Sequence, residues 1–588
     1  MTSGSTTKAV AGGAPCTPAD RALAALVDAG LGELAGLPGW SQADPQSVGE
    51  LLGAFAELVG EQIAPLSRRG DLQGSRLDTA SGRVRTPEGF ADAYRRYVAG
   101  GWPAVAFPES HGGGGMPWMV GTALADILNS ADLSFALCPM LTASAVELFS
   151  TWGTPDQQAR YLGKLISGEW TGTMNLTEPD AGSDVGALRT MAHPDGEGWR
   201  LSGTKVFITW GDHDMADNVV HLVLARTPGA PPGTRGLSLF AVPARLVDHE
   251  GRLGAANAVR CVALEHKLGI HASPTCVMEY DGAVGELVGE LHGGMRAMFT
   301  MMNTARLSVG VEGVAVAERA LQAAAAYAAV RRQGRLPGDP ADRSVPIAAH
   351  PDVARMLATM RALVDAARLL VYSAAHSLDL SRRHPDPQRR AEAAELTAFL
   401  VPLAKAWPTD VVNEVASLAV QVHGGAGYVE ETGVAQTLRD ARITAIYEGT
   451  NGIQAIDLVQ RKLDLQPDSA AMALLGRVEQ TAEALHKGGA HDEAAALADA
   501  AAAWRRAAEL LVDRRQHAPL DALAGATPFL TLTATMVAGW LLARSAVDAA
   551  DGGPLQVDPV TRFFLTQRLP QATALVPAIV ATAAELTW

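Results

Sequence analysis

The sequence predicts a mainly α-helical protein with a central β-domain and an additional α-helical domain at the C-terminal end. Apolar residues recur at helical spacing through residues 18–172, as in the run Val48–Ile63. Short β-branched and aromatic runs separated by turn residues fill residues 174–288, which is typical of a compact β-domain. Helical spacing returns over residues 295–463 and, after a linker, continues to the last residue. The predicted order is therefore α, β, α and a further α-domain.

A single hydrophobic core cannot organise a chain of 588 residues, so several domains are expected. A linker is predicted at Gln466–Ser469, where the composition turns to proline and polar residues. The predicted segments are a disordered tail (1–18), an N-terminal α-domain (19–173), the β-domain (174–288), a C-terminal α-bundle (289–465) and an additional α-helical domain (466–588). Within the β-domain we expect strands at Trp199–Leu201, Val206–Thr209, Val219–Leu224, Leu237–Val242 and Thr275–Tyr280.

Charge and composition exclude several classes of protein. The formal net charge of −15 argues against a general affinity for nucleic acid, which needs a basic surface. The N-terminal tail lacks the apolar core of a signal peptide. The apolar runs Phe529–Ala543 and Ala572–Ala584 fall short of the ~20 continuous residues of a membrane span, so we expect buried helices and no transmembrane segment. Scattered cysteines without metal-binding spacing predict free thiols, no metal site and a cytoplasmic location.

The most informative segment is Ile446–Gln454, in which Glu448 stands between Tyr447 and Gly449. A carboxylate in that setting can be partly desolvated, which raises its pKa and makes it a stronger base. The glycine lets the backbone come close to a ligand. A helix-end carboxylate in solvent would explain this segment alone equally well, so the interpretation depends on its agreement with other segments.

Three other unusual segments accompany it along the chain. Met174–Val185 is a turn cluster with hydroxyls and backbone N–H groups that suit a flavin edge or a phosphate. Gly203–Gly211 is a β-branched and aromatic run that ends in a turn, and Gln421–Tyr428 is a glycine cluster after a helical pattern. In this order and spacing, the four segments resemble the acyl-CoA dehydrogenase family. The resemblance extends from about residue 44 to about residue 463.

The resemblance implies an FAD-dependent enzyme that oxidises an acyl-CoA thioester to the trans-2-enoyl thioester. It assigns Glu448 as the base that removes the α-proton, and its backbone N–H as one of two donors to the thioester oxygen, with a flavin ribityl hydroxyl as the other. Some relatives place the base immediately before the arginine that is Arg306 here; that position is Ala305, which cannot accept a proton. Flavin-dependent nitroalkane oxidases use aspartate at the position of Glu448, so the glutamate counts against that activity.

The resemblance also implies the positions that bind the ligands. Phe207 takes the place of an aromatic residue, often tryptophan in the family, at the flavin edge. The family builds each FAD site across two subunits, so Arg331, Gln421 and Gly425 are expected to reach the cofactor of a neighbouring subunit. The implied FAD contacts are Thr177, Ser183, Phe207, Thr209, Arg331, Gln421, Gly425 and Thr450, and the implied substrate contacts are Ser183, Arg306, Tyr447 and Gly449.

The additional C-terminal domain indicates the longer bacterial members of the family, which include 3-methylmercaptopropionyl-CoA and broad-range fatty acyl-CoA dehydrogenases. Electron-transfer flavoprotein is the expected electron acceptor. An acyl-CoA oxidase that uses O₂ stays open, because these motifs do not separate the two. A flavin-containing nucleic-acid-binding, repair-associated protein is the alternative of another class; it requires a basic C-terminal domain, and only Arg505–Arg506 and Arg514–Arg515 cluster there. We expect a homodimer in which the additional domain covers the face that shorter relatives use to form tetramers.

Overall fold

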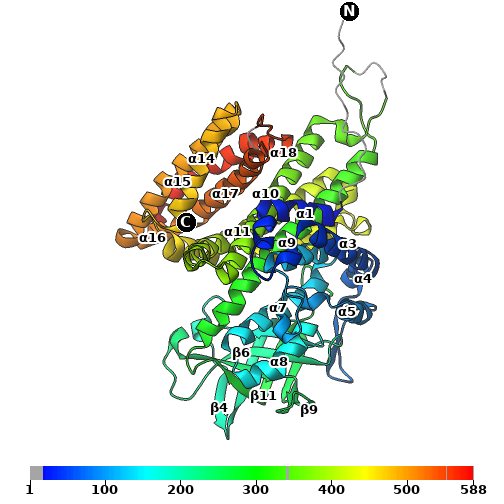
Figure 1. Cartoon of the computed structure of the whole chain (residues 1–588). Helices are drawn as coiled ribbons and strands as arrows, with labels where there is room; N and C mark the ends of the chain where they lie inside the picture. Colours follow the sequence, from blue (N-terminus) through cyan, green and yellow to red (C-terminus); the bar gives the residue numbers. More distant parts are fainter. Residues whose placement is uncertain (1–16, 339–342, 551–552, 587–588) are drawn as a thin grey trace, which may run out of the picture.

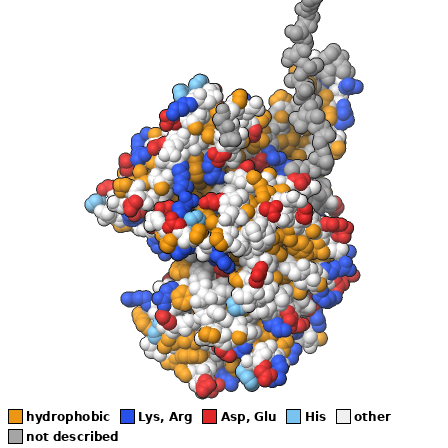
Figure 2. Space-filling view, in the orientation of Figure 1, with side chains coloured by type: hydrophobic (Ala, Val, Ile, Leu, Met, Phe, Trp, Pro, Cys, Tyr) orange, Lys and Arg blue, Asp and Glu red, His pale blue; other side chains and the backbone are white. Residues whose placement is uncertain are grey.

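A computed structural model describes residues 17–338, 343–550 and 553–586. The sheet domain lies at one end of the molecule, the long helices of a bundle run through its middle, and the C-terminal helices lie beside them (Figure 1). In the same orientation, Figure 2 shows the surface indented between the C-terminal helices and the sheet domain. The predicted α, β, α and further α order is confirmed.

The N-terminal region is helical, as predicted, and the run Val48–Ile63 is confirmed as helix α3. Of the predicted disordered tail, only Thr17 and Pro18 lie among the described residues, and Thr17 caps the first helix. A small hairpin, β1 (Arg76–Asp78) and β2 (Arg83–Arg85), was not predicted. The helices are α1 (Pro18–Ala29), α2 (Leu31–Ala35), α3 (Pro45–Gln62), α4 (Leu66–Gln73), α5 (Phe90–Ala99), α6 (Trp118–Ala131), α7 (Leu133–Trp152) and α8 (Pro155–Ser167).

A seven-stranded sheet forms the middle region, in the order β10-β11-β5-β4-β6-β3, with β7 joining β11 to β6. All five predicted strand runs are confirmed, although two of them belong to one long strand, β5. The strands are β3 (Trp170–Asn175), β4 (Met191–Asp195), β5 (Gly198–Thr209), β6 (Asn218–Arg226), β7 (Leu237–Pro243), β10 (Val259–Leu264) and β11 (Thr275–Val288). A separate ribbon pairs β8 (Arg245–Val247) with β9 (Leu253–Ala256).

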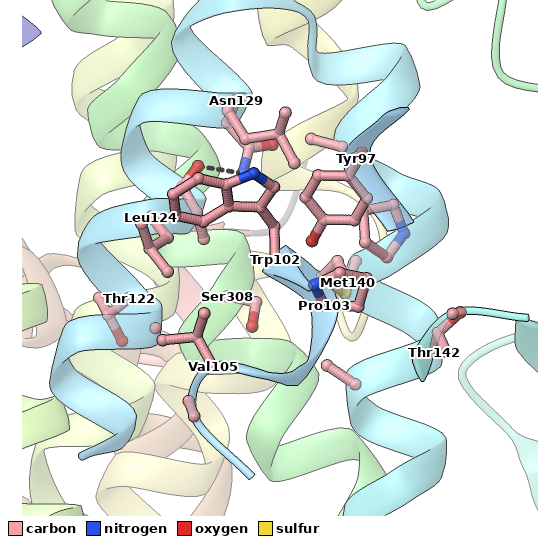
Figure 3. Close-up of a pocket in the computed structure, with 18 of the residues that line it drawn as sticks. Tyr97, Trp102, Pro103, Val105, Thr122, Leu124, Asn129, Met140, Thr142 and Ser308 are labelled. Atoms are coloured by element: carbon pink, nitrogen blue, oxygen red, sulfur yellow. Dashed lines mark hydrogen bonds between the residues drawn. The ribbon is translucent and has the colours of Figure 1, made fainter. Parts of the chain in front are cut away.

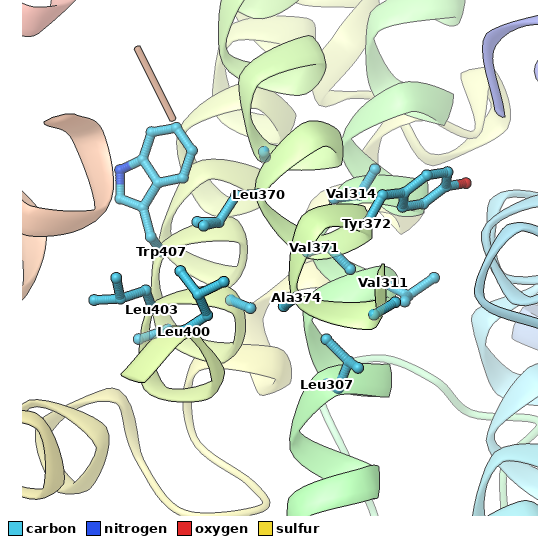
Figure 4. Close-up of a cluster of buried hydrophobic side chains, with 14 of the residues drawn as sticks. Leu307, Val311, Val314, Leu370, Val371, Tyr372, Ala374, Leu400, Leu403 and Trp407 are labelled. Carbon is cyan, nitrogen blue, oxygen red and sulfur yellow. The ribbon is translucent and has the colours of Figure 1, made fainter. Parts of the chain in front are cut away.

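Three long helices form the bundle, and two short ones complete it. They are α9 (Gly294–Val330), α10 (Pro351–Arg383), α11 (Pro387–His423), α12 (Val434–Ala441) and α13 (Asn451–Asp457). Their shared core holds aliphatic side chains from all three long helices, such as Val311, Leu370 and Leu403 (Figure 4). Trp407 of α11 points out of this core toward the C-terminal helices, where its ring centroid lies 6.3 Å from that of Phe564.

The C-terminal region packs on the bundle through α17, which contacts α10, α11 and α13. Its helices are α14 (Ala470–Lys487), α15 (His491–His517), α16 (Pro519–Ala524), α17 (Ala526–Ala550), α18 (Pro559–Phe563), α19 (Leu569–Thr573) and α20 (Val576–Val580). The run Phe529–Ala543 is a buried helix, as predicted. The prediction for Ala572–Ala584 was wrong: the segment breaks into short turns, because Pro577 lacks an N–H and starts a new turn.

Two helices of the described chain, Leu133–Trp152 and Ala526–Ala550, are long and apolar enough to cross a membrane by length and composition. Most of each apolar window, 78% and 83% respectively, is buried inside the protein. Both therefore have the packing of core helices. The cysteines Cys138, Cys261 and Cys276 are buried and free, while Cys16 lies outside the described residues.

Candidate active site

Glu448 lies on a tight bend between the short turn Arg442–Ala445 and helix α13. Its φ is 56° and that of Gly449 is 86°, so two consecutive residues are left-handed. A non-glycine residue pays about 1–2 kcal/mol for that conformation, so neighbouring contacts must hold it. Glycine is required at 449, because an added Cβ would come within 2.9 Å of Gln454 Nε2.

Asn451 fixes one end of this bend to helix α11. Its Oδ1 accepts a hydrogen bond of 2.8 Å from Lys405 Nζ, and its Nδ2 donates to Asp410 Oδ1 at 2.7 Å. The same amide donates to the Ala406 carbonyl at 3.1 Å. Pro408 interrupts the backbone ladder of α11 at this point, since it has no N–H. The side chains of Lys405 and Asp410 and the Ala406 carbonyl thus provide the docking point for the bend on α11.

Helix α9 holds the other side of the bend that carries Glu448. Tyr447 Oη donates a hydrogen bond to the Glu312 carboxyl, which lies on α9. Arg306, also on α9, donates from Nε to the Glu448 carbonyl at 3.4 Å and forms an ion pair with Asp457 at 3.9 Å. The bend is therefore suspended between two long, well-packed helices.

Electrostatics around the bend favour a base that works near neutral pH. Burial raises the pKa of Glu448 to about 7, against the opposing charges of Arg306 and Lys405. Burial also lowers the pKa of Lys405 to about 8, against the carboxylates around it. Glu448 is thus a stronger base than an exposed glutamate, and about half of it is ionised at pH 7.

The turn of Met174–Val185 carries the first group of implied cofactor residues. Thr177 is half-buried and Ser183 is exposed, and the Thr177 carbonyl accepts from the Val206 N–H at 2.9 Å, which ties the turn to β5. Thr209 ends β5, and its neighbour Phe207 is left-handed, with φ 59° and a side chain 61% exposed. The turn that carries Thr177 is therefore held next to the end of β5, where Phe207 is exposed.

Two residues that sequence reasoning missed brace this turn. Lys205 is fully buried and donates to Glu178 at 2.8 Å and to the Leu176 carbonyl at 2.9 Å. Glu178 also accepts from the Thr190 N–H at 3.0 Å. Lys205 is the single ionisable side chain of Gly203–Gly211, but Glu178 shares its segment with Asp180 and Asp184, so the sequence did not single out the pair.

Arg331, Gln421 and Gly425 lie apart from these groups. All three are exposed, at the C-terminal ends of α9 and α11, where the Tyr327 and His423 rings stack at 4.3 Å. Arg331 follows Arg306 by 25 positions, which corresponds to about 37 Å along a helix. These residues cannot reach the site of their own chain. Thr450 caps α13, accepting from the Ile453 N–H at 3.2 Å, directly beside Glu448.

A mostly apolar cavity of about 110 Å³ lies between α5, α6, α7 and α9 (Figure 3). Tyr97, Trp102 and Met140 line it, and Ser308 and Val311 of α9 form one wall. Ser308 comes two residues after Arg306 on the same helix. Glu448 does not line the cavity, so the cavity is not the place where the base would act.

Family models cover nearly the whole described chain. The acyl-CoA dehydrogenase N-terminal, middle and C-terminal domains match residues 52–169, 173–283 and 292–463, and an acetyl-CoA dehydrogenase C-terminal-like domain matches residues 474–587. The additional helices of the C-terminal region thus have a family model of their own.

Two curated relatives align over most of the chain. A 3-methylmercaptopropionyl-CoA dehydrogenase of Ruegeria pomeroyi is 49% identical over 513 residues, 87% of each chain. A broad-specificity linear acyl-CoA dehydrogenase of Mycobacterium tuberculosis is 32% identical over 91% of this chain and 92% of its own. Among solved structures, a Caenorhabditis elegans protein, ACDH-11 in complex with C11-CoA, matches with a TM-score of 0.76 at 22% identity, covering 96% of this chain and 93% of its own.

Proposed function

Because the chain belongs to the acyl-CoA dehydrogenase family, we propose that it dehydrogenates an acyl-CoA thioester to the trans-2-enoyl thioester, with Glu448 as the base. The protein is an FAD-dependent oxidoreductase of that family. The observation that carries the proposal for Glu448 is a half-buried carboxyl, whose pKa desolvation raises to about 7, on a left-handed bend fixed from both sides.

The donor set beside β5 fits FAD. Thr177, Ser183 and Thr209 offer hydroxyls to a polar ring edge, and the exposed Phe207 ring offers a flat apolar contact. The buried Lys205–Glu178 pair keeps the turn in place. When bound, FAD supplies an acceptor for the hydride that leaves Cβ. We infer that Arg331, Gln421 and Gly425 serve the cofactor of a second subunit, since Arg331 lies about 37 Å along α9 from Arg306 and the other two lie at the same end of the bundle.

The reaction requires a proton to leave Cα, whose acidity is far below that of a carboxylic acid. Each pKa unit of mismatch is worth ~1.4 kcal/mol, so the base needs help. The Glu448 carboxylate takes the proton, and the Glu448 N–H donates to the thioester oxygen as negative charge develops there. A fixed donor of this kind is typically worth ~10²–10³ in rate. The left-handed bend presents the amide and side chain of one residue together.

We propose that the acyl chain binds in the cavity of Figure 3 and that Arg306 contacts the CoA portion of the substrate, with Tyr447, Gly449 and Ser183 as further substrate contacts. The named relatives act on 3-methylmercaptopropionyl-CoA and on linear acyl-CoA thioesters. Tyr97, Trp102 and Met140 limit the cavity, so we expect short or medium chains to react faster than palmitoyl-CoA. Anaerobic flavin bleaching by a series from propionyl-CoA and 3-methylthiopropionyl-CoA to palmitoyl-CoA tests this. Failure of every thioester to bleach the flavin would contradict the proposed function.

Proton abstraction should depend on pH through Glu448. The carboxyl must be ionised to act as a base, and burial raises its pKa to about 7. The rate of flavin reduction at subsaturating substrate should therefore rise with pH through about 7, and be about fivefold lower at pH 6 than at pH 7. Stopped-flow absorbance across pH 5 to 8 measures it. A rising limb centred near 4.5, the value of an unburied glutamate, would contradict the buried setting of the base.

We further propose that electrons pass to electron-transfer flavoprotein and that the protein is a cytoplasmic homodimer. The indentation between the sheet domain and the C-terminal helices leaves one face open, while the helices of the C-terminal region cover another face of the bundle (Figure 2). Turnover with electron-transfer flavoprotein under argon, and no stoichiometric hydrogen peroxide in air, supports the acceptor. Peroxide formed in amounts equal to the enoyl product would identify an oxidase instead.

A further inference from the structure

Glu312 is a buried acid of helix α9 that has no part in the proposed proton transfer. It follows Arg306 by six positions and is fully buried. One of its oxygens accepts from Tyr447 Oη, and the other, Oε1, has no hydrogen-bond partner among the described residues. An unpaired carboxylate oxygen in the interior is costly, whereas the neutral acid is much less so.

The groups that face this acid come from every element packed around it. Tyr447 and Glu448 on the bend and Lys405 on α11 act on Glu312 directly. The charges next to these neighbours are Arg306 of α9, Asp410 of α11 and Asp440 of α12. Burial raises the pKa of Glu312 to about 8; the Tyr447 hydrogen bond opposes this, the negative charge of Glu448 adds to it, and Lys405 opposes it. The neutral acid therefore predominates at pH 7.

The helices that carry Glu312 and Lys405 cannot move apart or together freely. A Cβ at Gly310 would lie 2.1 Å from the Ala404 carbonyl oxygen, and one at Gly313 would lie 2.7 Å from that of Pro408. The backbones of α9 and α11 thus touch at this level. Tyr447 is tied to α9 and Asn451 to α11, so the bend spans two anchor points at a fixed separation.

We propose that Glu312 is a positioning residue for the base: through the Tyr447 hydroxyl it holds the left-handed bend that carries Glu448, and it does so as an uncharged acid. The inference rests on the proposed role of Glu448. An anchor without charge holds the bend and adds no second negative charge where charge develops on the thioester oxygen. An ionised Glu312 would hold Tyr447 equally well but would repel that charge.

Two substitutions of Glu312 test its role as the hydrogen-bond acceptor for Tyr447. Glu312→Gln keeps an acceptor for Tyr447 and stays neutral, so anaerobic flavin reduction at pH 7 should stay within about threefold of the unmodified protein. Glu312→Ala removes the acceptor and lets the bend relax, so kcat should fall by about 10–100-fold with little change in KM, because a small misplacement of a reacting group is costly. Rescue by glutamine but not alanine distinguishes positioning from packing. A Glu312→Ala protein that reduces flavin at the unmodified rate would overturn the proposal.

The pH profile tests the neutral state of Glu312. The rate in the unmodified protein should decline above about pH 8 as Glu312 ionises, and Glu312→Gln should lack that decline. Identical profiles up to pH 9 would overturn the neutral-anchor assignment. The infrared difference between the unmodified protein and Glu312→Gln should also contain a carboxylic acid C=O band at pH 7, and a carboxylate band there instead would overturn it.

The infrared readout needs no turnover, so it does not depend on whether Glu448 is the base. Glu448→Gln is run in parallel: if that protein still reduces flavin quickly, the proposed role of Glu448 as the base fails, while the Glu312 band of the unmodified protein still tests the neutral state of Glu312. If Glu312→Ala does not fold, the comparison of Glu312→Gln with the unmodified protein across pH and by infrared still decides the proposal.

Discussion

Removal of residues 470–588 should yield a protein that aggregates or assembles into larger oligomers, with FAD-site residues still present upstream. Helix α17 packs on α10, α11 and α13, and the Trp407 ring lies against Phe564. Uncovering such side chains costs about 1.5–3 kcal/mol each, and an apolar face of that extent favours association. Light scattering on the truncated protein measures the outcome.

Polar contacts between the C-terminal region and the bundle also indicate that truncation would disturb the bundle. Arg515 donates to the carbonyls of Val459 and Leu463 at 3.1 and 3.0 Å, and Arg568 pairs with Glu414 at 2.9 Å. In the truncated protein these carbonyls and this carboxylate lose their partners. The expectation is therefore cooperative loss of order near α13 as well as exposure of α10 and α11.

A matched pair of substitutions separates this interface from general surface effects. Phe564 is fully buried, whereas Leu520 is 70% exposed. Phe564→Ser should lower the melting temperature and promote association, and Leu520→Ser should change neither. The full-length protein should scatter as two chains. A mass near four chains, or a truncated protein that stays monodisperse as a dimer, would contradict the covering role of the C-terminal region.

Sequence patterns predicted the fold where the physical signal is local. Helical spacing marked α3 and α17, and β-branched runs marked β6 and β7. The failure at Ala572–Ala584 has a local cause too: composition alone suggested a buried helix, but Pro577 starts a new turn. The hairpin at residues 76–85 is too short and too charged to be recognised from its sequence pattern.

In the candidate site, too, the sequence predicts the features that depend on neighbouring residues and misses those that depend on packing. Glu448 was predictable because an aromatic residue and a glycine flank it, but its left-handed backbone was not, since glutamate rarely adopts that conformation. Glu312 and Tyr447 are 135 positions apart, and Lys205 and Glu178 are 27 apart. Such pairs meet only after the helices and strands have packed. No pattern within one segment of the chain could have identified them.

Glu448→Gln should abolish the chemical step while leaving the protein folded and yellow. The amide fills the same space, but it cannot take a proton, and loss of a general base typically costs ~10²–10⁴ in rate. Its folded state should not suffer: burial raises the pKa of Glu448, so the ionised carboxyl opposes folding above its unfolded pKa, and a neutral amide removes that penalty. The FAD absorbance spectrum and the melting temperature provide the controls.

Anaerobic stopped-flow mixing of Glu448→Gln with a saturated acyl-CoA that bleaches the unmodified enzyme tests the central claim most directly. The structure predicts a flavin spectrum that stays oxidised, with a reduction rate about 10⁴-fold below that of the unmodified enzyme. Bleaching at a rate close to that of the unmodified enzyme would show that another group takes the α-proton, and would contradict the role of Glu448.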